Sequence, residues 1–199
     1  GWHDLDGFDG ADDTRSVGNN VNAYDDQNDD NLPDGYVEGG ASLSFDFPFS
    51  PTPNSTPLNS REAAITQLFY ANNRIHDVLW HYGFDEESGN FQAVNYTGAA
   101  GDFDAVNAEA FDGSGTNNAN FSTPADGGNG RMQMYLWSGS PQKDGDVDNG
   151  VVSHEFAHGI SNTFTHKVFK SSIPQTDLAS LQRGAKYFMN YSNLAAHHL

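Results

Sequence analysis

The residues with the clearest chemical meaning are His154, Glu155 and His158, which form an H-E-x-x-H pattern inside an apolar run. Residues four apart on a helix lie on one face, so the two imidazoles can bind a single cation. Glu155 projects about 100° round the helix axis from His154, where it can take a proton from a bound water. The spacing predicts a zinc site with Glu155 as general base. Two histidines also meet this spacing by chance, so the motif alone leaves a purely structural helix open.

Two helices are predicted to position this motif and its surroundings. A buried helix is expected over about residues 149–165, because apolar residues lie at helical spacing on both sides of the motif: Val151, Val152, Phe156 and Ile160. A longer helix is expected over about 60–82, with Asn59 or Ser60 as its N-cap and Gly83 after its end. Its apolar positions are Ala63, Ala64, Leu68, Ile75, Leu79 and Tyr82.

The remaining sequence up to residue 148 has the pattern of loops and short strands. Residues 1–60 are rich in Asp, Asn, Gly and Pro, and the alternating segment Ala41–Phe47 predicts an edge strand. Residues 84–145 contain similar short segments, among which Arg131–Trp137 is a good strand candidate. We therefore expect strands both before and after the long helix.

The chain is strongly acidic and has no cysteine. It carries 27 acidic and nine basic residues among 199, a formal net charge of −18, and repulsion from phosphate argues against a nucleic-acid partner. Its apolar runs are too short to cross a membrane, and its first residues lack a signal-peptide pattern, which favours a mature chain whose leader has been removed. An acidic surface suits an extracellular protein, but without disulfides such a chain needs another source of stability, for which calcium is the candidate.

One acidic segment resembles an EF-hand-like calcium loop. Oxygen-bearing side chains occupy loop positions one, three, five and nine, and these are Asp26, Asn28, Asp30 and Asp34. Asn31 occupies the position where such loops need a left-handed conformation, which Asn tolerates. The alternative is an acidic, solvated loop without an ion.

The charge changes sign near the end of the chain. Residues 1–165 hold five basic and 26 acidic residues, whereas residues 166–199 hold four basic residues against Asp177 alone. A basic surface helix and a junction to unrelated sequence are both consistent with this change.

Several segments spread over roughly residues 1–162 form a recognisable series: Asn19–Ala23, Gln67–Asp77, Gly83–Phe84, Gly89–Gln92, Asp112–Phe121, Asp126–Gly127, Gly130–Trp137 and His154–Asn162. Together they resemble, in the same order, the fungalysin family of secreted zinc endopeptidases, which is related to thermolysin. So many ordered matches are far more specific than the zinc motif alone.

The resemblance implies an α+β fold, the N-terminal half of a thermolysin-like peptidase with a twisted, mostly antiparallel sheet, a long helix and a central zinc-binding helix. Residues 1–148 would form a β-rich subdomain containing the long helix, 149–165 the zinc helix, and 166–199 an atypical basic tail in place of the helical C-terminal domain. Asn118 and Ala119 would lie on the edge strand that binds the substrate, since an open strand edge offers hydrogen bonds to an extended peptide. Without the resemblance, a Gly/Asn-rich surface turn would be preferred there.

The family also has a third zinc ligand, a Glu downstream of the second His, and a later His that stabilises the transition state. This sequence has no Glu after Glu155 and lacks the C-terminal half. Catalytic zinc normally has three protein ligands. Asp177, His166, a partner chain or a separate C-terminal fragment are the alternatives for the third.

Three functions are consistent with the sequence. The leading hypothesis is a secreted zinc endopeptidase that cuts protein or peptide substrates, present as an incomplete catalytic domain, with a propeptide or C-terminal fragment as a further partner. The alternative is a catalytically inactive, calcium-stabilised extracellular remnant that binds peptides. A different zinc hydrolase that shares the helix is the third.

Overall fold

The computed structural model describes residues 1–166 except 9, 51, 53–55 and 102. The elements in chain order are β1 (Val21–Asp25), α1 (Arg61–Trp80), β2 (Val106–Ala110), β3 (Ala119–Ser122), β4 (Arg131–Met134), β5 (Leu136–Trp137), β6 (Lys143–Asp144) and α2 (Asn149–His166), with short 3-10 helices η1 at Pro57–Ser60, η2 at Glu86–Ser88 and η3 at Gly145–Val147. The predicted basic tail lies outside the described residues, apart from His166, the last residue of α2.

The chain is α+β, as predicted, but its main sheet is mixed. Its strand order is β1-β2-β4-β3, and β1–β2 and β2–β4 pair in parallel whereas β3–β4 is antiparallel. The expectation of a mostly antiparallel sheet was therefore wrong. Parallel neighbours need a long crossover connection, and α1 provides it between β1 and β2. Only the small β5–β6 pair adds further antiparallel pairing among the described strands.

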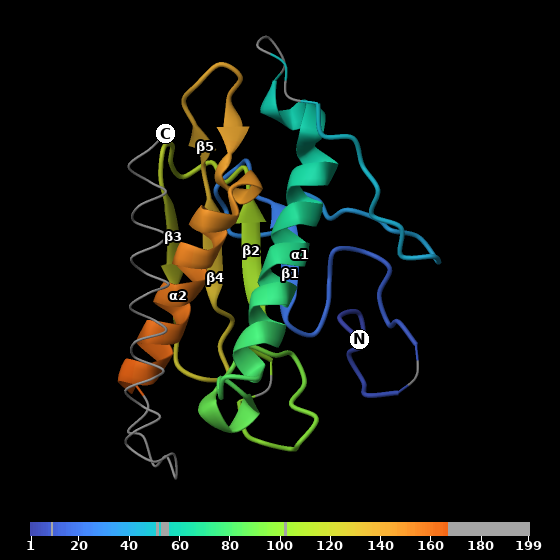
Figure 1. The fold of residues 1–199 in the computed structure, drawn as a ribbon, viewed down its shortest axis with the longest axis vertical. Coiled ribbons are helices and arrows are strands. Elements are labelled where there is room, and N and C mark those ends of the chain that lie inside the picture. The colour runs from blue at the N-terminus through green and yellow to red at the C-terminus, as the bar shows by residue number, and fades with distance from the viewer. Residues whose placement is uncertain (9, 51, 53–55, 102, 167–199) are drawn as a thin grey trace.

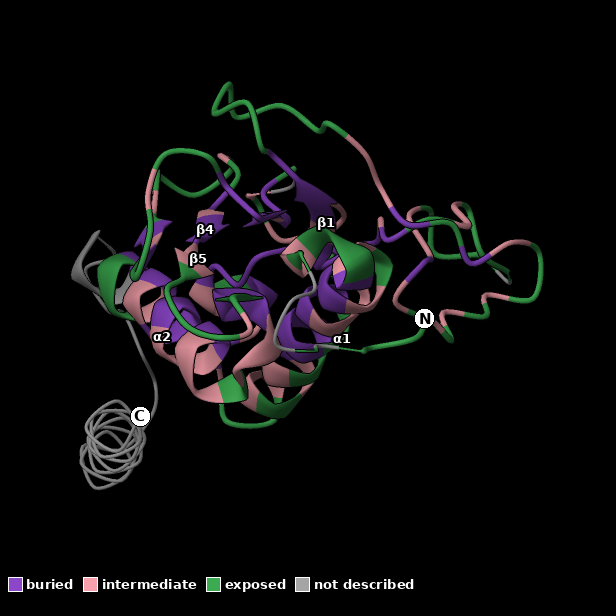
Figure 2. Ribbon diagram, turned by 90° about the horizontal axis from the view of Figure 1, so that it is seen from above, coloured by how far each residue is buried: buried purple, intermediate pink, exposed green. Residues whose placement is uncertain are grey.

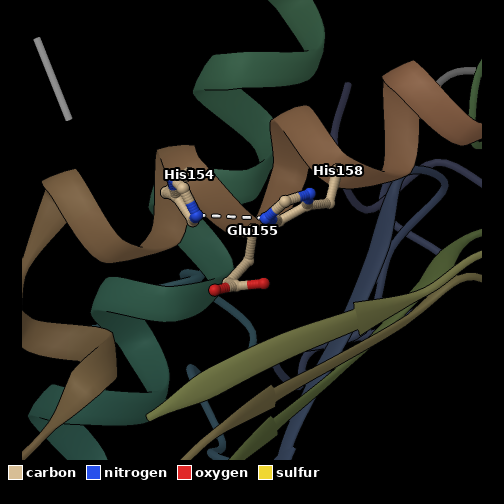
Figure 3. A group of neighbouring side chains, drawn as sticks. All are labelled: His154, Glu155 and His158. Carbon is tan, nitrogen blue, oxygen red and sulfur yellow. Dashed lines mark hydrogen bonds between the residues drawn. The ribbon is translucent and has the colours of Figure 1, made fainter. Parts of the chain in front are cut away.

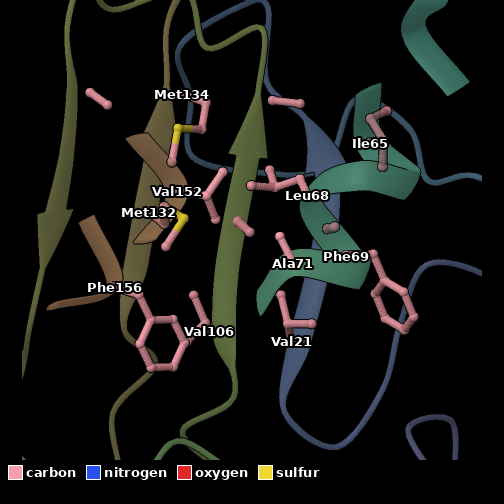
Figure 4. Packing of buried hydrophobic residues seen from close by; sticks show 14 of the residues in the cluster. Val21, Ile65, Leu68, Phe69, Ala71, Val106, Met132, Met134, Val152 and Phe156 are labelled. Carbon is pink, nitrogen blue, oxygen red and sulfur yellow. The ribbon is translucent and has the colours of Figure 1, made fainter. Parts of the chain in front are cut away.

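Both helices cover one face of this sheet (Figure 1). Seen from above, α1 and α2 lie side by side, and buried residues concentrate where they meet the strands (Figure 2). Strand β2 alternates, so that Val106, Ala108 and Ala110 are fully buried. They pack with Met132 of β4 in the apolar core shown in Figure 4, which also contains Val152 and Phe156 of α2.

The long helix begins and ends as its sequence indicates. Ser60 is the residue before α1, although its side chain makes no capping hydrogen bond. Beyond Trp80, the turn that ends the helix includes Gly83, with φ of +94°. Glycine adopts this conformation without steric penalty, which explains its place there.

The strand predicted at Ala41–Phe47 does not form. Residues 41–43 make a turn and the rest is irregular. The apolar side chains of this segment pack separately instead of lining one face of a strand, and Phe45 and Phe47 contact the apolar core. The Phe45 ring stacks 5.5 Å from His3 and 6.1 Å from Phe69, measured between ring centroids. The other strand candidate, Arg131–Trp137, is divided between β4 and β5.

None of the helices among the described residues is both long and apolar enough to cross a bilayer.

Candidate metal centre

The H-E-x-x-H residues lie within α2, and their side chains converge (Figure 3). The Nε2 atoms of His154 and His158 are 3.0 Å apart, and the two rings are nearly perpendicular, at 87°. Two nitrogens bound to one tetrahedral zinc at 2.0–2.1 Å lie about 3.3 Å from each other. The two imidazoles therefore fit a shared zinc ion with only a small adjustment.

Glu155 completes this group from the buried side of the helix. One of its oxygens and the two histidine nitrogens all lie within 4.8 Å of one another. The side chain points from α2 towards the sheet, and the residue is 6 % exposed. Burial raises the pKa of Glu155 to about 7, because a buried carboxylate loses its hydration. The carboxyl group is thus able to accept and release a proton near neutral pH.

His154 is held in the form that binds metal. Burial lowers the pKa of His154, and the neighbouring His158 lowers it further because two positive charges at this distance repel. Neutral imidazole is the form that donates a lone pair to a cation. His154 therefore suits a metal at neutral pH.

The first turn of α2 is fixed by caps and by α1. Asp148 Oδ1 accepts a hydrogen bond from the Gly150 N–H at 2.7 Å, and Asp148 O accepts one from Val152 at 3.1 Å. Asn149 Oδ1 accepts from Gln67 of α1 at 2.6 Å. These contacts set the position from which His154, one turn later, reaches the site.

The helix approaches β3 closely at Gly159, directly after His158. A Cβ at Gly159 would lie 2.7 Å from the Phe121 ring, so the contact requires glycine. Within the described residues β3 pairs only with β4, which leaves its other edge open. Asn118 precedes β3 and is exposed, whereas Ala119 is 8 % exposed. The substrate-binding role of these two residues stays a prediction.

The predicted calcium loop uses its side chains mainly for its own turns. Asp26 accepts from the N–H groups of Asp30 and Asn31 at 3.1 and 2.8 Å. Asp34 accepts from the Asn28 side chain at 2.8 Å. Among the described residues no group of three converging His, Asp or Glu side chains contains Asp30 or Asp34. Calcium binding by Asn28, Asp30 and Asp34 stays a prediction.

Asp26 instead converges with two residues that the sequence had not singled out. Its ligand atom lies within 4.8 Å of those of Glu109 and Asp112, and all three residues are buried. The available signal was a glutamate within the strand sequence V-N-A-E-A, followed by F-D-G. Its partner could not be identified, because Asp26 is far away in the sequence.

The alternatives for the third zinc ligand are not placed by the structure. Asp177 lies outside the described residues. His166 is the last residue of α2, and its side chain is also outside the described part.

A helix that carries H-E-x-x-H with both histidines on one face is typical of metalloproteases. The chain belongs to the fungalysin metallopeptidase family (M36), which matches residues 1–184. The match extends past residue 162, where we had expected the likeness to end, and into the basic tail.

Named relatives support this assignment. The chain is 51 % identical over 133 residues to "Extracellular metalloproteinase MEP" of Fusarium vanettenii, a match covering 65 % of this chain and 20 % of the relative. It is 51 % identical over 131 residues to "Extracellular metalloproteinase 3" of Trichophyton tonsurans, covering 64 % and 20 %. It is 45 % identical over 166 residues to "Extracellular metalloproteinase 2" of the same fungus, covering 81 % and 25 %. The chain spans about a fifth to a quarter of the length of these relatives.

Proposed function

We propose that this chain is the N-terminal part of the catalytic domain of a secreted, zinc-dependent endopeptidase. The observation that carries the proposal is the convergence of His154, Glu155 and His158, with two imidazole nitrogens 3.0 Å apart. Secretion is supported by the relatives, which are named extracellular metalloproteinases. Their substrates are proteins or peptides, and we propose the same for this protein.

His154 and His158 would hold the zinc. When bound, the metal lowers the pKa of a water molecule and polarises the scissile carbonyl. Glu155 lies beside both imidazoles, and one carboxylate oxygen accepts the proton of the attacking water. The same oxygen can then return this proton to the leaving amine.

The third zinc ligand would come from Asp177, His166, a partner chain or a separate C-terminal fragment. Residues 1–148 would then form the strand-rich half of the domain, with the helix over 149–165 at its boundary. The edge of β3 that faces away from β4, with Asn118 and Ala119, would bind the extended substrate by main-chain hydrogen bonds.

The second candidate is an inactive, peptide-binding remnant of such a peptidase. The sequence feature that favours it is the lack of any Glu after Glu155. Calcium would stabilise the remnant, and a propeptide would be the natural occupant of its β3 edge. The two candidates share their fold and differ in zinc content and turnover.

Zinc analysis and casein hydrolysis at pH 7 distinguish them. We expect about one zinc per chain and hydrolysis that falls by about 10²- to 10⁴-fold in Glu155→Gln, since this is the usual contribution of a general acid–base. Zinc content should be unchanged in that variant. Glu62→Gln, an exposed glutamate on α1, is the matched control and should keep full activity. If the protein binds calcium but neither binds zinc nor hydrolyses casein, the result favours the inactive, peptide-binding remnant over the peptidase.

A further inference from the structure

The face of the sheet turned away from the helices is polar and closely bonded. Tyr24, Glu109, Gln133 and Asn120 lie opposite one another in register across the four strands. The Tyr24 hydroxyl donates to Glu109 Oε1 at 3.1 Å, and Asn120 donates to Gln133 Oε1 at 2.9 Å. Glu109 of this row also belongs to the Asp26–Glu109–Asp112 group.

Three carboxylates meet at one end of this row. Asp26 follows β1, Glu109 lies in β2 and Asp112 follows β2, so the ends of two parallel strands bring them together. They are 0, 0 and 2 % exposed, and one oxygen of each lies within 4.8 Å of the others. Like charges this close and this deeply buried repel strongly unless another charge offsets them.

The hydrogen bonds around the group leave one oxygen unsatisfied. Asp112 Oδ2 accepts from Gln133 at 2.6 Å, and the oxygens of Asp26 accept from backbone N–H groups. Glu109 Oε2 is fully buried and has no hydrogen-bond partner. The nearest cation, the Arg131 guanidinium, has its Nε 3.8 Å away, beyond hydrogen-bond reach, and that Nε is also unsatisfied.

The charge of the group matches a divalent ion. Three carboxylates and one guanidinium leave two negative charges, both in the interior. The ligand atoms on offer are all oxygens, without the imidazole or thiolate that transition metals prefer. Calcium accepts several carboxylates in irregular geometry, whereas magnesium demands a near-ideal octahedron and keeps its waters.

We propose that Asp26, Glu109 and Asp112 bind a calcium ion on the face of the sheet opposite the zinc helix. The ion would join the end of β1, the end of β2 and the loop that starts at Asp26. This site differs from the predicted calcium loop, with which it shares only Asp26. The side chains of Asp30 and Asp34 would shape the loop around the ion without binding it.

The competing explanation is a proton in place of the ion. Burial is the main cause, and the nearby Asp112 the second, of a rise in the pKa of Glu109 to about 8. Without a bound cation, Glu109 would therefore hold a proton at neutral pH. A protonated Glu109 would hydrogen-bond to a neighbouring carboxylate and need no metal. The two explanations predict opposite responses to calcium.

The test uses the intact protein in zinc-replete buffer with calcium, magnesium and terbium as probes. Calcium should raise the melting temperature, and magnesium should do so far less. Terbium should show tyrosine-sensitised luminescence that calcium displaces, because the Tyr24 hydroxyl is bonded to Glu109. Glu109→Gln keeps the side-chain size but removes the charge, and we expect it to bind one calcium fewer or to weaken that site by more than about tenfold.

Asp34→Asn is the matched control, because Asp34 lies outside the buried group, and it should retain the calcium response. If Glu109→Gln does not fold, Asp112→Asn takes its place and should show the same loss. Calcium binding that is equal in wild type and Glu109→Gln, or that is lost only in Asp34→Asn, would overturn the proposal. A wild-type protein whose stability and terbium signal do not respond to calcium would also overturn the proposal. That outcome is expected if Glu109 holds a proton in place of the ion.

Discussion

The close approach of α2 to β3 predicts that Gly159→Ala destabilises the protein through the Phe121 ring. The added methyl carbon would lie 2.7, 2.8 and 3.1 Å from three carbons of that ring. The ring has little room to withdraw. A Cβ at Gly130 would also lie 2.9 Å from it, and its centroid is 5.6 Å from that of Phe91 and 6.3 Å from that of Phe156. The same ring therefore fills the space left by two glycines.

Two opposing effects set the magnitude. Forcing a methyl group into a packed site costs about 1–3 kcal/mol. Replacing glycine by alanine inside a helix gains about 1 kcal/mol. The free energy of unfolding of Gly159→Ala should thus fall by about 0–2 kcal/mol in the wild-type background. In a Phe121→Val background the ring carbons are gone, and the same substitution should instead stabilise by about 1 kcal/mol.

Urea unfolding of the four proteins of this double-mutant cycle measures the difference. We expect a coupling energy of about 1–3 kcal/mol between Gly159 and Phe121. Each single variant is compared in zinc-replete buffer, so that metal occupancy does not differ between them. A coupling energy below about 0.5 kcal/mol would mean that the ring moves aside freely, and would refute this account of how α2 is positioned.

Three further predictions concern other parts of the molecule. Asn118→Ala should lower kcat/KM for peptide hydrolysis by about three- to tenfold, the value of one hydrogen bond, without changing the urea midpoint; equal kcat/KM would exclude Asn118 from substrate binding. Arg61→Met should reduce the free energy of unfolding by about 3 kcal/mol, since Arg61 pairs with the buried Asp25, and Arg74→Met, on the same helix, serves as control. Burial raises the pKa of Asp104 from 3.8 to about 7, so the folded state holds its proton more tightly and this contribution to stability is lost as pH rises from about 4 to 7. Urea unfolding measures the free energy of unfolding across that pH range. From pH 4 to 7 it should fall by up to about 4 kcal/mol less in Asp104→Asn than in the wild type, and parallel pH profiles of the two proteins would contradict this prediction.

The helices and the histidine pair could be predicted because their signals are local. An apolar face repeats every three to four residues in 149–165, and the same period in 60–82 identifies α1. Because His154 and His158 are four residues apart on one helix, their convergence follows from helix geometry alone. The role of each in binding zinc still depends on a third ligand that local spacing does not identify.

The pairing of the strands and the convergence of the buried carboxylates could not be predicted, because they depend on contacts between distant segments. Alternation in Ala41–Phe47 suits a strand, but Phe45 gains more by packing on His3 and Phe69 than by pairing. Parallel pairing of β1 with β2 is decided by the crossover through α1. Glu109 and Asp26 lie on neighbouring strand ends only as a result of that pairing.

Strand β2 connects the two sites, because its register decides which side chains face each of them. Val106 and Ala108 pack towards the helices, whereas Glu109 faces Tyr24 and Gln133 on the polar side. A shift of one residue would turn Glu109 into the core beneath α2 and disrupt the packing behind the histidines. Burying that charge against apolar residues would be strongly unfavourable, whereas the polar face offers it a hydroxyl, a guanidinium and, in our proposal, calcium. An ion at Glu109 would therefore stabilise the strand register on which the position of the zinc helix depends.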